Sequence, residues 1–177
     1  MEKIYIDGNS LTLTDFIKVA RHNYKIDLTE SAKEEVERSR RLVEKFVNSN
    51  KTIYGITTGF GKFSEHIINK EESKRLQRNL IVSHACGVGH PLKEEYVRGI
   101  ILLRINALAK GYSGIRLSTL NTLIEMLNKG IHPIIPEKGS LGASGDLAPL
   151  AHMALVFIGK GEAIYKGQRM SGQEAME

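Results

Sequence analysis

The spacing of apolar residues predicts a chain built mainly of α-helices. Apolar side chains recur at helical spacing over residues 36–47, and Ser31 with Glu34 matches the S-x-x-E capping box that begins many helices. Three further helices are expected, at about Lys70–His84, Lys93–Lys110 and Leu117–Lys129. Gly111 and Gly130 follow the last two, which is typical of helix C-terminal ends.

Extended and loop segments come before and between these helices. Lys3–Ile6 is expected to form a short strand, and a short helix should follow from about Leu13, with Thr14 or Asp15 near its cap. The Gly- and Thr-rich stretch Thr52–Gly61 is typical of a loop.

The last third of the chain alternates proline- and glycine-rich stretches with one apolar helix. His132–Pro136 should be extended, because proline disfavours helix at its own position and at the one before. A glycine-rich loop, Gly139–Gly145, leads into a strongly apolar helix at about Asp146–Ile158. No repeat or linker divides the chain, so we expect one unit over residues 1–177.

Composition changes this prediction little, but it excludes several classes of protein. With 177 residues, 41% of them apolar and 25% charged, the chain is neither disordered nor collagen-like. The single cysteine, Cys86, excludes an intramolecular disulfide and fits a reducing cytoplasm. The sequence contains no apolar run of the ~20 residues that a membrane span needs and no signal peptide at its start. A cytoplasmic protein without membrane partners is expected.

The net charge of +5 raises the question of nucleic-acid binding. Most basic residues stand beside acids, as in Lys70–Arg75, which is typical of a solvated helix face. The sequence has no Trp and no basic run interleaved with aromatic residues. We therefore expect no nucleic-acid partner.

Common cofactor and metal motifs fail on spacing. Gly61-Lys62 lacks both the earlier glycine and the Ser or Thr of a phosphate-binding loop, and no dinucleotide fingerprint is present. The six histidines form no H-E-x-x-H motif, and one cysteine is too few for most zinc sites. Neither a metal nor a nucleotide cofactor is expected.

One stretch of fifteen residues, Gly139–Met153, carries a far more specific pattern. Its sequence, GSLGASGDLAPLAHM, resembles the signature of the aromatic amino acid ammonia-lyases. The resemblance implies that Ala143, Ser144 and Gly145 cyclise to the electrophile methylidene-imidazolone (MIO). A glycine-rich helix entry with a capping Asp is the plain structural alternative for the loop alone.

The residue types suit that chemistry. Ring closure requires the Gly145 nitrogen to attack the Ala143 carbonyl, and glycine tolerates the tight turn that this requires. Loss of the Ser144 hydroxyl as water leaves the exocyclic methylene. Asp146 is placed to cap the next helix and to handle protons during cyclisation. The positive N-terminal end of that helix would favour negative charge at the ring.

A second stretch, Tyr54–Gly61, resembles the tyrosine loop of the same family, with Thr57 where Asn is usual. The resemblance implies that Tyr54 is the catalytic acid/base and that Gly61 supports the loop. A phenol is a weak base at neutral pH, so this role requires surroundings that favour the phenolate. Alternatively, Tyr54 is an ordinary buried aromatic residue with a paired hydroxyl.

A third stretch, Asn79–Gly89, resembles the substrate-selectivity region of the family. The order Ser83-His84 resembles the histidine branch, which implies that His84 contacts the substrate. A histidine near a helix end can also serve simply as a cap that the helix dipole stabilises.

Taken together, the resemblance implies the N-terminal globular part of an ammonia-lyase, with short strands and loops around helices. The C-terminal helical bundle, through which the family forms homotetramers, is expected to be absent. The capping box at Ser171 and Glu174 comes so close to Glu177 that the sequence looks cut.

The activity implied for the complete enzyme is non-oxidative deamination of L-histidine to trans-urocanate, and the fragment alone should be inactive. Two alternatives stay open. One is a tyrosine or phenylalanine ammonia-lyase or aminomutase, and the other is a catalytically silent scaffold.

Overall fold

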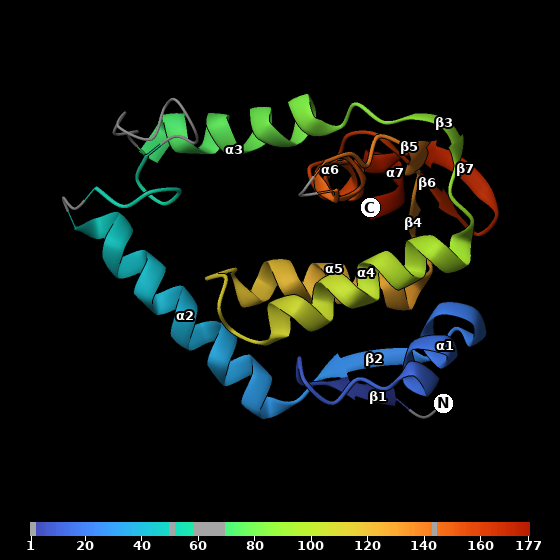
Figure 1. The fold of residues 1–177 in the computed structure, drawn as a ribbon, viewed down its shortest axis with the longest axis horizontal. Helices are drawn as coiled ribbons and strands as arrows, with labels where there is room; N and C mark the ends of the chain where they lie inside the picture. Colours follow the sequence, from blue (N-terminus) through green and yellow to red (C-terminus); the bar gives the residue numbers. More distant parts are fainter. Residues whose placement is uncertain (1–2, 50–51, 59–69, 143–144) are drawn as a thin grey trace.

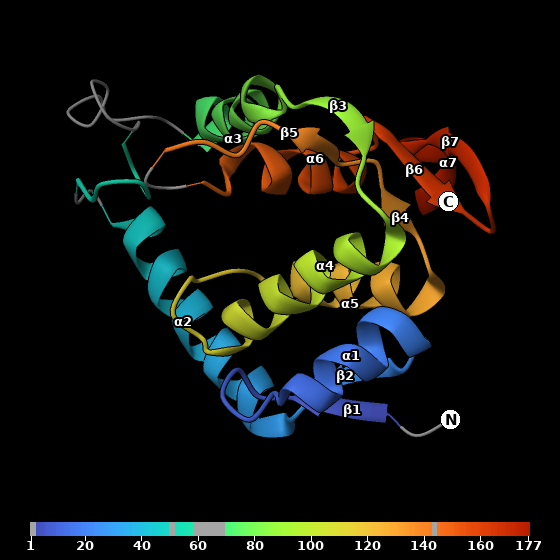
Figure 2. The ribbon, with the colours of Figure 1, turned by 45° about the vertical axis from the view of Figure 1, so that its right-hand side comes forward.

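The computed structural model describes residues 3–49, 52–58, 70–142 and 145–177, and these form a mainly helical structure (Figure 1). Helices α4 and α5 lie in the middle, between a layer that contains the N-terminus and a layer that contains α3 and α6, and α2 runs along one side (Figures 1 and 2). The described helices are α1 (Leu13–His22), α2 (Glu30–Asn48), α3 (Lys70–His84), α4 (Glu94–Ala109), α5 (Leu117–Lys129), α6 (Leu147–Phe157) and α7 (Gly172–Met176). The predicted mainly α fold is confirmed.

The N-terminal layer is a small parallel strand pair connected by a helix. Strand β1 (Lys3–Ile6) pairs in parallel with β2 (Lys25–Leu28), and α1 makes the crossover. Thr12 is the N-cap of α1 and forms a capping box with Asp15. The predicted cap at Thr14 or Asp15 was therefore wrong by a few residues, because Asp15 is the third helical residue of that box.

The start of α1 at Leu13 agrees with prediction, whereas the start of α2 was predicted too late. Thr29, not Ser31, is the N-cap, and its hydroxyl accepts a hydrogen bond from the Ala32 amide at 3.2 Å. Strand β2 ends at Leu28, so the chain is still extended at Thr29 and turns directly into the helix. The Ser31–Glu34 capping box predicted from sequence is not the start of this helix.

Helices α4 and α5 form the centre of the main hydrophobic core. Their bounds agree with prediction to within one residue, and Gly130 ends α5 in the left-handed conformation with φ of +75°. The core around them takes side chains from both neighbouring layers, including Ile26 of β2, Val36 of α2 and Met153 of α6. The core therefore joins the elements that carry the predicted site to the rest of the chain.

Short strands connect the helices of the third layer. Strand β3 (Val88–Pro91) pairs antiparallel with β5 (Pro136–Lys138). A second sheet has the antiparallel order β4-β6-β7, formed by β4 (His132–Pro133), β6 (Glu162–Tyr165) and β7 (Gln168–Ser171). The extended stretch predicted at His132–Pro136 is confirmed at both of its ends.

The C-terminal hairpin was missed from the sequence, whereas the capping box after it was found. Lys166 and Gly167 both have positive φ, 51° and 76°, as the two-residue type I′ turn of a β-hairpin requires. Beyond β7, Ser171 and Glu174 form the predicted capping box at the start of α7. Separately, none of the described helices is both long and apolar enough to cross a membrane.

Candidate functional site

The loop before α6 is closed by its own hydrogen bond. The Ser140 hydroxyl donates to the carbonyl of Gly145. Gly142 and Gly145 have φ of +78° and +59°, a region that glycine enters without the cost of a Cβ. The predicted Ala143 and Ser144 lie outside the described residues. What the structure describes around them is a tight glycine loop, and this is compatible with ring closure between neighbouring residues.

Helix α6 begins directly after this loop. Asp146 occupies the cap position, and its carbonyl accepts the first helical hydrogen bond from the Leu150 amide at 3.0 Å. The predicted cap position of Asp146 is confirmed, although the cap is made by its backbone and not by a side-chain capping hydrogen bond. Pro149 lies in the first turn, where its missing N–H costs the helix nothing. Gly145 is therefore presented at the positive end of the helix dipole.

His84 is the last residue of α3, and its ring orientation is determined by the helix backbone. Its Nδ1 lies 2.7 Å from the carbonyl oxygen of Leu80, and the Ser83 hydroxyl donates to the same carbonyl at 3.1 Å. A carbonyl only accepts hydrogen bonds, so Nδ1 carries the proton. In the neutral tautomer with its proton on Nδ1, Nε2 is the ring atom that is able to accept a hydrogen bond from a ligand.

The structure brings the segment after His84 and the loop before Gly145 together. In the antiparallel ladder of β3 and β5, Val88 pairs with Lys138, so Gly87 and Gly139 lie at the same end of the two strands. A Cβ added to Gly139 would lie 2.9 Å from the Cα of Gly87, closer than packed atoms approach. Helix α3 also packs along α6.

Tyr54 lies on a different connection, in the turn that follows α2. The Ile56 and Thr57 amides both donate to the carbonyl of Ile53, at 3.1 and 3.0 Å. Tyr54 is 62% exposed in this chain and is not buried by the other described residues. Figure 1 places this turn near the N-terminal end of α3, whereas His84 lies at the opposite end of that helix. The predicted Gly61 lies outside the described residues.

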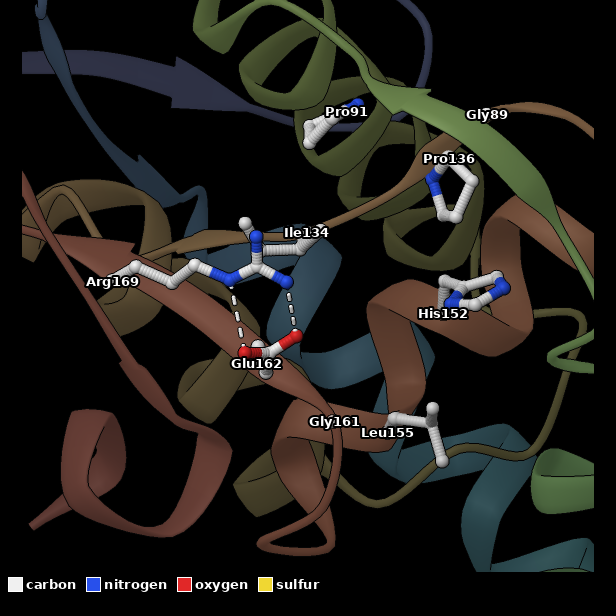
Figure 3. A pocket seen from close by; sticks show the side chains of 9 residues that line it. All are labelled: Gly89, Pro91, Ile134, Pro136, His152, Leu155, Gly161, Glu162 and Arg169. Carbon is white, nitrogen blue, oxygen red and sulfur yellow. Dashed lines mark hydrogen bonds and ion pairs between the residues drawn. The ribbon is translucent and has the colours of Figure 1, made fainter.

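A cavity of about 290 Å³ lies beside the β3–β5 ladder, and sequence reasoning did not find it (Figure 3). One wall carries an ion pair in which the Arg169 Nε donates to Glu162 at 2.9 Å. None of the predicted site residues that the structure describes, which are Tyr54, His84, Gly145 and Asp146, lines this cavity. Its lining residues are Gly89, Pro91, Ile134, Pro136, His152, Leu155, Gly161, Glu162 and Arg169. They come from α6 and from several strands and strand ends, and no sequence pattern that they share would have predicted the cavity.

The described part of the chain contains no cluster of side chains that could hold a metal ion. No group of three or more His, Cys, Asp or Glu side chains comes together there.

Comparison with known proteins places this site in a family. The family model for aromatic amino acid lyases matches residues 11–177. The chain belongs to the aromatic amino acid lyase family. That match contains both the glycine loop and the His84 segment.

The individual relatives of this lyase chain are longer than the chain itself. It is 68% identical, over its whole length, to histidine ammonia-lyase from Alkaliphilus oremlandii, and it spans 35% of that protein. Its fold matches that of ergothionase from Treponema denticola with a TM-score of 0.93 and 32% identity, and the match covers 98% of this chain and 35% of that one. It also matches histidine ammonia-lyase from Trypanosoma cruzi with a TM-score of 0.89, 34% identity, 99% of this chain and 34% of that one. The chain thus spans about a third of the proteins it resembles.

Proposed function

We propose that this chain is the MIO-bearing part of an ammonia-lyase that converts L-histidine to trans-urocanate and ammonia. The observation that carries the proposal is the 68% identity to a histidine ammonia-lyase over the whole chain, including the order Ser83-His84. The family match supports the reaction class, and this high identity supports the choice of histidine over the other aromatic substrates.

In this proposal Ala143, Ser144 and Gly145 form the MIO group, which supplies an electrophilic methylene that makes the substrate's amino group a better leaving group. The described part of the loop fits this role. Gly145 already has a left-handed backbone and stands at the N-terminal end of α6, where developing negative charge is stabilised. Asp146, next to the ring, would help to move protons during its formation.

His84 would hold the substrate. Its Nδ1 donates to the Leu80 carbonyl, so Nε2 is the atom through which the neutral ring would accept a hydrogen bond, and an N–H of the substrate imidazole is a suitable donor. Tyr54 would remove the β-proton of the substrate, and Gly61 would support its loop. The 62% exposure of Tyr54 supports a site completed by further protein.

We therefore propose that the complete subunit is about three times longer, in line with the 35% coverage of the relative, and that it contains the helical bundle absent here. We propose further that the subunits form a homotetramer whose active sites combine segments of several subunits. The single cysteine, Cys86, supports a location in the reducing cytoplasm.

Intact mass and product analysis of the complete subunit test this proposal. Cyclisation of Ala143-Ser144-Gly145 removes the mass of two water molecules, and the Tyr54→Phe variant should keep that loss. The same variant should lose about 10²–10⁴-fold in turnover, the usual contribution of a general acid or base. An unchanged rate in Tyr54→Phe would exclude the proposed role of the phenol. Release of coumarate or cinnamate in place of urocanate would show that the enzyme belongs to the tyrosine or phenylalanine branch.

A further inference from the structure

A histidine outside the predicted site joins its two halves. His152 lies on α6, and its Nε2 lies 3.0 Å from the backbone nitrogen of Gly87. A Cβ added to Gly87 would lie 3.0 Å from the same Nε2, so ring and backbone are in direct contact. The contact spans 65 positions of sequence and adds a link from α6 to the residue that precedes the β3–β5 ladder.

The direction of this hydrogen bond determines the protonation of the ring. A backbone N–H only donates, so Nε2 of His152 is the acceptor and the ring proton resides on Nδ1. Burial lowers the pKa of His152, which favours the neutral ring that this bond needs. The His152 imidazole therefore accepts this hydrogen bond through Nε2.

The two ends of this hydrogen bond are close in sequence to the two halves of the candidate site. Gly87 comes three residues after His84, and His152 is on the helix that begins just after Gly145. Gly87 is also confined on its other sides, because an added Cβ would lie 3.1 Å from the Lys138 carbonyl oxygen. This hydrogen bond therefore acts together with the β3–β5 ladder in holding the segment after α3 beside the glycine loop.

We propose that His152 is a positioning residue, whose Nε2 holds the Gly87 amide and so sets the place of His84 relative to the Gly139–Gly145 loop. Its effect on the reaction rests on the proposed function, because it acts through His84. The residue itself need not touch the substrate or the electrophile.

Paired variants of the complete subunit separate the acceptor from the bulk of the side chain. His152→Leu keeps a similar volume without an acceptor, whereas the Oε1 of His152→Gln reaches about as far as Nε2. His152→Asn carries the same amide on a shorter side chain, and this gives a second, polar comparison if the leucine variant does not fold. His22→Leu is the control, because it makes the same change at an exposed position in the last turn of α1.

Hydrogen exchange at the Gly87 amide tests the contact without any need for activity. Exchange should be at least about tenfold faster in His152→Leu and His152→Asn than in the parent, as expected for the loss of a bond of about 1.4 kcal/mol. His152→Gln and His22→Leu should keep the parental rate. Unchanged exchange in both the leucine and the asparagine variants would overturn the proposal.

Kinetics with L-histidine test the consequence for the site. We expect KM to rise about tenfold in His152→Leu, with the mass loss of two waters retained and KM close to the parent in His152→Gln. Equal impairment in the glutamine and leucine variants would show that the acceptor is unimportant. Loss of the mass change would mean that His152 acts on formation of the electrophile, which also contradicts positioning. A parent protein without urocanate release would refute the proposed function, while Gly87 exchange would still decide the contact.

Discussion

Arg98 should be one of the most important side chains for stability, although it has no part in the proposed reaction. It lies on α4, is only 3% exposed, and donates three hydrogen bonds to backbone carbonyls. Two reach Val19 in the last turn of α1, at 3.0 and 2.8 Å, and one reaches Leu127 in the last turn of α5, at 3.1 Å. One guanidinium thus satisfies the C-terminal ends of two helices at once.

The expected cost of removing this group follows from those bonds. Arg98→Met keeps much of the volume but deprives the Val19 carbonyl of two donors, and an unsatisfied buried acceptor costs about 1–3 kcal/mol. The Leu127 carbonyl keeps a bond from the Gly130 amide at 3.3 Å, so its share is smaller. Burial lowers the pKa of Arg98, so removing the charge also relieves some desolvation. We expect a net loss of about 2–3 kcal/mol.

Urea unfolding of the protein measures this loss. With a slope of about 2 kcal/mol/M, the midpoint of Arg98→Met should fall by about 1 M without a change in slope. Arg98→Lys keeps the charge but not the planar fork, so it should recover less than half of the loss. Arg41→Met is the matched control, because Arg41 is 69% exposed and its change should cost less than about 0.5 kcal/mol. A midpoint for Arg98→Met within about 0.2 M of the parent would refute the reasoning.

Two further predictions concern pH and backbone packing. The pKa of His132 lies below its usual 6.5, because the lowering by burial is stronger than the raising by Glu94, whose carboxylate is 3.0 Å away. The unfolded chain therefore binds a proton at His132 more readily than the folded protein does, and the free energy of unfolding should fall as the pH drops below about 6.5. The His132→Gln variant should show a weaker pH dependence when urea midpoints are measured between pH 5 and 7. Gly172→Ala should destabilise the protein by about 1–3 kcal/mol in the same assay, because the new Cβ would lie 2.1 Å from the Lys160 carbonyl oxygen. Gly167→Ala is the comparison: it has space but a φ of +76°, so its cost should be smaller, and equal costs would contradict the packing argument.

Local signals in the sequence were sufficient for most of the helices. Helices α4 and α5 were predicted to within one residue, because their apolar spacing and terminal glycines are both local features. The start of α1 at Leu13 was predicted correctly, but its cap residue and the start of α2 were misplaced, because several Ser, Thr and Asp residues stand close together and each is a possible cap. For α2, strand β2 decides the cap, because it ends at Leu28 and leaves Thr29 extended where the helix begins.

The C-terminal hairpin shows the opposite case, in which a local signal existed but was weak. Lys166-Gly167 is not the usual Asn-Gly of a type I′ turn. It forms such a turn because β6 and β7, on either side of it, pair with each other. The candidate site was found through the glycine loop and the order Ser83-His84, which are continuous in sequence. The hydrogen bond from Gly87 to His152 could not be found in that way, because its partners are 65 positions apart.

By itself, the sequence determined the helical class, the glycine loop before α6 and the family to which the chain belongs. These depend on residues close together in the chain, where spacing and backbone preference act directly. Only the tertiary structure decided that Arg98 joins two helix ends and that Gly87 and Gly139 touch. It also decided that the His152 ring accepts a hydrogen bond from the Gly87 amide. Such contacts form because distant elements must bury their apolar faces together, and the polar groups buried with them must then find partners across the core.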